Sequence, residues 1–66
     1  MYTLITYILK TSQGETKDAA IHLTCMAKLA WYYKDSRVSG ISSVEFNNLA
    51  DAQAVQARFR LANEVA

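Results

Sequence analysis

The chain has 66 residues and a mass of 7.4 kDa, which is enough for one small domain and too little for a large catalytic cleft. Apolar residues make up 52% of it and charged residues 20%, values typical of a globular protein and not of a disordered one. The net charge of +1 gives no general attraction to nucleic acid or to a membrane surface. A single cysteine and a single histidine exclude an internal disulfide and a zinc site built from four thiol and imidazole ligands of one chain.

Residues 1–9 lack the positively charged region of a signal peptide, and their apolar run is too short to cross a bilayer. The lone Cys25 suits a reducing compartment, so we expect a cytoplasmic protein without membrane contact. A domain of this size is marginally stable by itself. We therefore expect it to gain support from a second copy, as a homo-oligomer and most simply a dimer, or from a larger protein partner.

Residues 2–10 are rich in β-branched and aromatic side chains and contain no breaker, which predicts a strand. Both of its alternating faces are largely apolar. A strand of this kind is expected to be covered on both sides.

Residues 17–34 predict a helix, with Thr16 as its cap and Asp18 in its first turn. At 100° per residue its apolar side chains gather on one face, which we expect to form the core: Ala19, His22, Leu23, Met26, Leu29, Ala30 and Tyr33. An alternative is a hairpin that turns at Gln13-Gly14 and begins a second strand at Glu15. The sequence Asp18-Ala19-Ala20 is poor strand sequence, so we favour the helix.

Residues 37–47 predict a strand whose serines suit a sheet edge, and residues 49–65 predict a helix with Asn48 as N-cap and Asp51 at N3. The predicted fold is a single α+β domain over residues 1–66, two-layered, with the order β-α-β-α. Two strands make a poor sheet in isolation. We therefore expect the sheet to be completed by dimerisation or by a partner.

Asp18, His22 and Cys25 form the one cluster of reactive residue types, at spacings i, i+4 and i+7. On a helix they would share one side and be candidates for a metal site completed by water or a second subunit. A simpler interpretation is a histidine hydrogen-bonded to Asp18, beside a cysteine that packs as a small apolar residue. Such spacing arises easily in any helix, so we favour the simpler interpretation and expect no metal and no cofactor.

Trp31 and Tyr32 lie beside the polar stripe of the first predicted helix, one turn after Lys28. Large rings with one polar tip are the side chains that most often anchor protein interfaces. We expect a partner-binding surface made of Lys28, Trp31 and Tyr32, joined by Arg58 and Leu61 of the second helix. The alternative is that Trp31 packs into the core.

Five cations allow a different hypothesis, a basic patch interleaved with aromatic rings that would stack on single-stranded bases. They are Lys28, Lys34, Arg37, Arg58 and Arg60. Acidic residues are mixed among them, so ordinary solvated charges are the simpler interpretation.

No catalytic carboxylate pair, nucleophile elbow or phosphate-binding loop is present in the sequence, so we expect no enzyme. The sequence predicts a small protein–protein interaction module that acts by steric blockade. By analogy of size alone, it fits a phage-type inhibitor of a larger host protein. The alternatives are a nucleic-acid-binding module and a structural subunit of a homo-oligomer.

Overall fold

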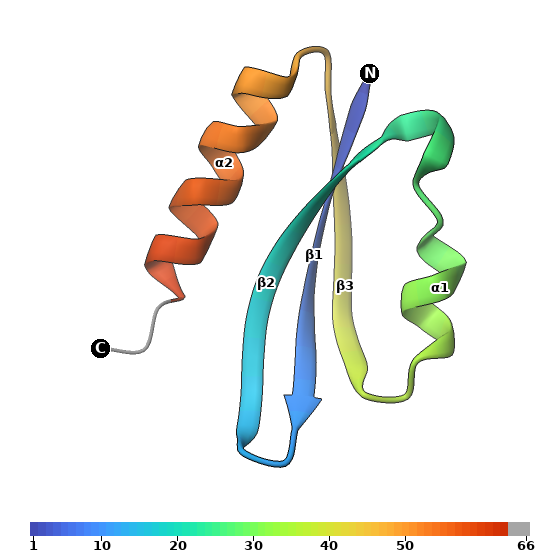
Figure 1. Cartoon of the computed structure of the whole chain (residues 1–66), viewed down its shortest axis with the longest axis vertical. Coiled ribbons are helices and arrows are strands. Elements are labelled where there is room, and N and C mark those ends of the chain that lie inside the picture. Colours follow the sequence, from blue (N-terminus) through green and yellow to red (C-terminus); the bar gives the residue numbers. More distant parts are fainter. Residues whose placement is uncertain (64–66) are drawn as a thin grey trace.

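A computed structural model, which describes residues 1–63, shows a three-stranded antiparallel sheet and two α-helices (Figure 1). The elements follow the order β1 (Tyr2–Thr11), β2 (Gly14–Leu23), a 3-10 turn (Thr24–Met26), α1 (Leu29–Lys34), β3 (Val38–Phe46) and α2 (Leu49–Ala62). The predicted α+β class is confirmed. The predicted order is wrong at one place, because the observed order is β-β-α-β-α.

The error lies in residues 17–34, which were predicted as one helix. Residues 17–23 of this segment belong to β2 instead. β2 pairs with β1 over its whole length, from Tyr2 opposite Leu23 to Thr11 opposite Gly14. This is the alternative hairpin, which we weighed against the helix and did not favour, shifted by one residue. Its turn is formed by Ser12 and Gln13, and Gly14 begins β2 with a φ of 120°. Pairing along ten residues of β1 outweighs the weak strand propensity of the segment, as tertiary contacts commonly do.

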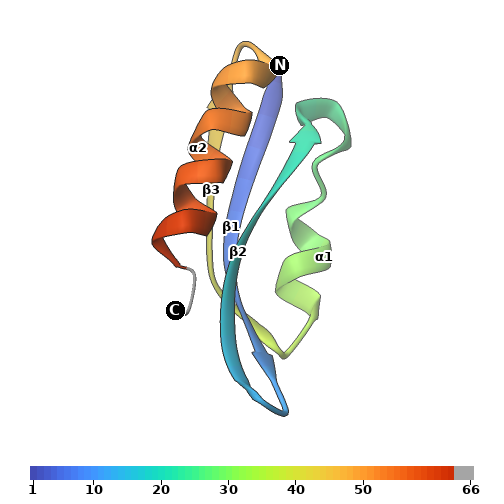
Figure 2. The ribbon, with the colours of Figure 1, turned by 60° about the vertical axis from the view of Figure 1, so that its left-hand side comes forward.

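β1 is the central strand of the sheet, with β2 on one side and β3 on the other. The two helices lie on opposite sides of the sheet, as Figure 2 shows. The prediction that the first strand is covered on both faces is therefore confirmed, and the two-layer arrangement is wrong. The third strand explains how the chain builds a sheet that two strands would not sustain.

A β-bulge interrupts the pairing of β1 with β3 between Thr6 and Ile8. Gly40 lies on β3 opposite this point and adopts a φ of 59°. A Cβ atom at Gly40 would lie 3.0 Å from the Cδ1 atom of Ile8, which is tighter than normal van der Waals contact. Both the backbone angle and the close side chain favour glycine here.

α2 begins as predicted, because the Asn48 side-chain oxygen accepts a hydrogen bond from the Asp51 N–H at 2.8 Å. The Asn48 amide also donates to the Asp51 carboxylate at 2.9 Å. The last part of the predicted helix, which includes Val65, lies outside the described residues. Ala52, one turn into the helix, is fully buried.

The core is very small. Within the described range, the fully covered apolar side chains are Leu4, Ile5, Ala19 and Ala52. The chain measures 35 × 30 × 12 Å and exposes 4902 Å² to solvent, whereas a folded monomer of 7.4 kDa exposes about 4,200 Å². The whole chain thus exposes about 700 Å² more surface than a compact monomer of its mass would.

Four residues expected in the core, Leu23, Met26, Ala30 and Tyr33, are instead exposed. The expectation assumed one continuous helix with a single apolar face. The chain is a strand up to Leu23, then forms the 3-10 turn, and α1 begins only at Leu29. The continuous apolar face of the predicted helix therefore does not exist.

Candidate functional site

The most exposed indole or phenol side chains of the described residues are on α1, where Trp31 is 65% accessible. α1 has only six residues, and successive side chains of a helix diverge by about 100°. When Tyr32 faces the sheet, Trp31 and Tyr33 are directed to either side of it and away from the core. The short helix thus forces large rings into solvent.

Tyr32 holds α1 against the sheet. Its ring lies 5.2 Å from the ring of Tyr7 on β1, and its hydroxyl is 2.9 Å from the Nε2 atom of His22 on β2. Partial burial raises the pKa of Tyr32 and also that of Tyr7, so both phenols are neutral at physiological pH. Tyr32 was predicted as a partner-contact residue. Its main role in the fold is instead to hold α1, and with it Trp31, in place against the sheet.

Trp31 separates two hollows and lines both of them. One hollow, of about 300 Å³, lies between α1 and the sheet and is bordered by Tyr7, Leu9 and Val38. The other, of about 520 Å³, is bordered by Ile21, Leu23, Met26 and Lys28, together with His22 and Cys25. An exposed ring that lines two shallow and mostly apolar hollows has the form of an interface anchor.

We use the name Trp31 surface for Trp31 together with Leu23, Met26 and Lys28. Leu23 and Met26 were missed because they were assigned to the core, yet both are exposed and line the same hollow as the indole. The Lys28 ammonium lies 4.9 Å from the centroid of the Trp31 ring, within the range of a cation–π contact. Lys28 and Trp31 therefore lie where the prediction grouped them.

The charge beside this surface is positive. Lys34 and Arg37 follow Trp31 along the chain, and Arg37 binds Asp35 through two hydrogen bonds of 3.1 and 2.9 Å. The Arg37 guanidinium lowers the pKa of the Asp35 carboxyl, so this acid stays ionised and neutralises one of the cations. Lys28 and Lys34 remain as cations without an ion pair among the described residues.

Arg58 and Leu61 do not join the Trp31 surface. Both lie on α2, on the opposite side of the sheet from α1 (Figure 2), and Leu61 is 70% accessible. The five predicted partner-binding residues are thus divided between two faces. The hypothetical basic patch is divided in the same way, because Arg58 and Arg60 lie on α2.

Asp18, His22 and Cys25 are not brought together, because the helical side to which they were assigned is absent. Asp18 binds Arg60, His22 binds Tyr32, and Cys25 is exposed on the 3-10 turn. Nowhere in residues 1–63 do three side chains of histidine, cysteine, aspartate or glutamate gather closely enough to hold a metal ion.

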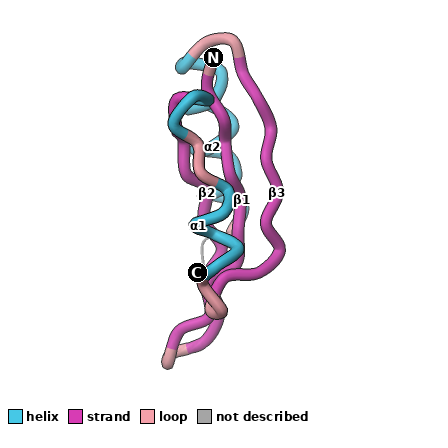
Figure 3. Tube along the Cα trace, turned by 90° about the vertical axis from the view of Figure 1, so that its right-hand side faces the viewer, coloured by secondary structure: helices cyan, strands magenta, loops and turns pink. Residues whose placement is uncertain are grey.

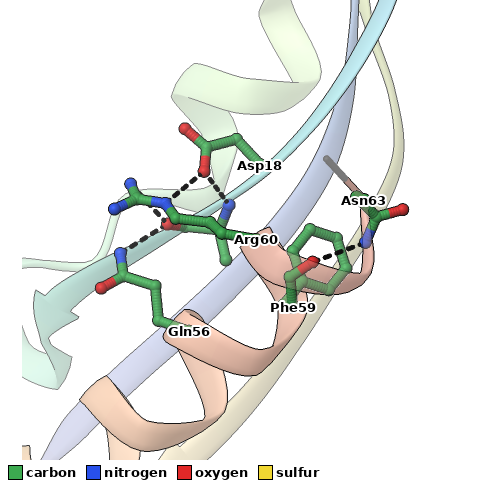
Figure 4. Close-up of polar contacts among 6 residues, drawn as sticks. Asp18, Gln56, Phe59, Arg60 and Asn63 are labelled. Atoms are coloured by element: carbon green, nitrogen blue, oxygen red, sulfur yellow. Dashed lines mark hydrogen bonds and ion pairs between the residues drawn. The ribbon is translucent and has the colours of Figure 1, made fainter. Parts of the chain in front are cut away.

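A group of hydrogen bonds between α2 and the outer edge of β2 was not predicted from the sequence (Figure 4). Arg60 Nε donates to Asp18 Oδ1 at 2.7 Å, and Gln56 Nε2 donates to the Ala19 carbonyl oxygen at 2.6 Å. The hydrogen bond from Arg60 lowers the pKa of Asp18. The i, i+4 spacing of Gln56 and Arg60 on one helical face was the available signal.

No helix among the described residues is both long and apolar enough to cross a membrane.

The sequence matches no protein-family model, and neither the search of curated proteins nor the search of solved structures found a similar protein.

Proposed function

We propose that this chain is a non-enzymatic binding module that docks on a larger protein through the Trp31 surface. The observation that carries the proposal is the 65% exposure of Trp31, which lines two mostly apolar hollows, whereas very few apolar side chains of residues 1–63 are fully covered. Tryptophan is among the residues that contribute most to binding when a partner covers it.

The surface is prepared for binding in two respects. Tyr32 holds α1 against the sheet through Tyr7 and His22, so little backbone freedom of α1 is lost when a partner arrives. Lys28 adds positive charge beside the Trp31 ring, and Lys34 follows Trp31 three residues later at the end of α1. The matching partner is a protein that offers an apolar side chain bordered by carboxylates.

A rigid particle of this size acts by occupying space on its partner. Steric blockade of a host protein, in the manner of a phage-encoded inhibitor, is the specific form that we favour, on the analogy of size. We place the protein in the cytoplasm, since the thiol of Cys25 is exposed and unpaired.

The test compares three versions of the purified protein against each protein that it retains from an extract: wild type, Trp31→Ala and Leu61→Ala. Leu61 is a matched control, because it is equally exposed but lies on the other side of the sheet. Loss of a central anchor is expected to cost about 2 kcal/mol, or about a 30-fold weaker Kd.

Titration calorimetry measures each Kd, and far-UV circular dichroism verifies that both variants are folded. The proposal predicts that Trp31→Ala weakens binding and that Leu61→Ala does not. Equal affinity of wild type and Trp31→Ala for every retained protein would contradict it.

A further inference from the structure

The two edge strands of the sheet, β2 and β3, differ in whether side chains occupy their outward backbone groups. At the edge of β2, the Ala19 N–H donates to Asp18 Oδ1 at 2.8 Å, and the Ala19 carbonyl oxygen accepts from Gln56 and from Arg60 Nη2. The outward backbone groups in the middle of this strand are thus occupied by side chains. Such capping prevents another strand from pairing there.

The edge of β3 has no such protection. Among residues 1–63, no side chain forms a hydrogen bond with the backbone of Val38–Phe46. Figure 3 shows β3 along the side of the molecule with neither helix beside its outer edge. The strand also lacks proline and lysine, which commonly block sheet edges.

The hydrogen-bond pattern identifies the free backbone groups. The Lys10 N–H donates to the Arg37 carbonyl oxygen at 2.7 Å, so even-numbered residues of β1 direct their backbone groups toward β3. Across the register, the backbone of Val44 then points toward β1. The N–H and C=O groups of its neighbours Ser43 and Glu45 point away from the sheet.

We propose that two copies of the protein pair through β3 in antiparallel orientation about a two-fold axis at Val44, which gives a continuous six-stranded sheet. Ser43 of one copy then exchanges two hydrogen bonds with Glu45 of the other, and the same pair recurs across the axis. The side chains of the two Val44 residues, each 53% exposed in the single chain, cover one another.

Charge disfavours one of the neighbouring registers. A shift of one residue along each strand toward the C-terminus would place the two Glu45 carboxylates directly opposite each other, which is unfavourable. In the register centred on Val44, each Glu45 faces the uncharged Ser43 instead. This segment also lies beyond the bulge near Gly40, so the paired backbone is regular.

The area of exposed surface agrees with a second copy as the occupant. The chain exposes about 700 Å² more than a compact monomer of its mass, and a standard interface buries about 800 Å² per partner. This inference goes beyond the proposed function, because residues 43–45 of β3 include no residue of the Trp31 surface or of the two hollows beside it. Either proposal can fail while the other stands.

The test is the mass of the purified chain by sedimentation equilibrium over a range of concentrations. The expected species is a dimer that dissociates on dilution. Ser43→Pro removes an outward N–H and should give a monomer, whereas Lys17→Pro removes an outward N–H from the β2 edge and should leave the dimer intact. Val44→Lys, which sets two ammonium groups face to face, should also give a monomer, with Val44→Thr as its control.

Cysteine cross-linking tests the register in a Cys25→Ser background. Val44→Cys should give a disulfide-linked dimer on mild oxidation, because directly opposite residues of this type have Cα atoms about 4.5 Å apart. Glu45→Cys should not, because the two positions would be offset along the strands.

A wild-type chain that is monomeric at all concentrations overturns the proposal and leaves the β3 edge to a strand of another protein. A dimer that survives both Ser43→Pro and Val44→Lys also overturns it, since its interface must then lie elsewhere. If Ser43→Pro fails to fold, Val44→Lys and the cross-linking decide the matter.

Discussion

Truncation of Ile5 is the sharpest test of how little core supports this fold. Ile5 lies on the central strand and is 0% exposed, and only Leu4 is a comparably large buried side chain among the described residues. Replacing a buried isoleucine by alanine costs about 2–5 kcal/mol. At roughly 0.05–0.15 kcal/mol per residue, the whole chain has about 3–10 kcal/mol of stability.

Ile5→Ala should therefore remove a large share of the free energy of unfolding, and Ile5→Val, at about 0.5–1.5 kcal/mol, a modest share. Urea unfolding followed by far-UV circular dichroism measures both, at one fixed protein concentration because association shifts apparent stability. Leu61→Ala is the control and should change the free energy by less than about 0.5 kcal/mol. The reasoning is refuted if Ile5→Ala costs no more than Leu61→Ala.

Three further predictions concern the bulge of the sheet, the cap of α2 and the ion pair between α2 and β2. Gly40→Ala should destabilise the fold by about 1–2 kcal/mol through its positive φ alone, and a variant as stable as wild type in urea would contradict the assigned bulge. Asn48→Ala should cost about 1 kcal/mol by removing the cap of α2, and an unchanged thermal midpoint would show that the cap contributes nothing. Arg60→Ala should lower the free energy of unfolding at neutral pH only slightly, since both partners of its ion pair are largely solvated. Because Arg60 lowers the pKa of Asp18, the stability from this pair is complete above the ordinary carboxyl pKa and is lost as pH falls through the lowered value. Urea unfolding should thus show a smaller loss of stability below about pH 4 in Arg60→Ala than in wild type, and identical pH profiles would exclude the effect.

The sequence predicts those parts of the fold that local signals determine. β1 is a run of β-branched and aromatic residues, β3 has the serines expected of a strand at a sheet edge, and α2 begins at an asparagine cap. β2 was missed because its Asp18-Ala19-Ala20 segment has little strand character of its own. Its conformation depends on pairing with β1, and Ala19 fits there because a small side chain allows α2 to approach.

The candidate site was predicted in part, for a related reason. Lys28 and Trp31 are neighbours on a short helical stretch, so the wrong helix boundaries did not separate them. Leu23 and Met26 lie at the end of β2 and in the turn that follows, where the helical pattern gives the wrong side. Leu61 was grouped with Trp31, although sequence alone does not tell on which side of the sheet each helix packs.

Quenching of tryptophan fluorescence by acrylamide tests the central claim most directly, because Trp31 is the single indole of the chain. The account predicts that the purified protein emits at long wavelength and is quenched almost as readily as a free tryptophan amide, in the dimer as well as in the monomer. A blue-shifted indole that acrylamide does not reach would show that Trp31 is buried and that the surface proposed to bind a partner is absent.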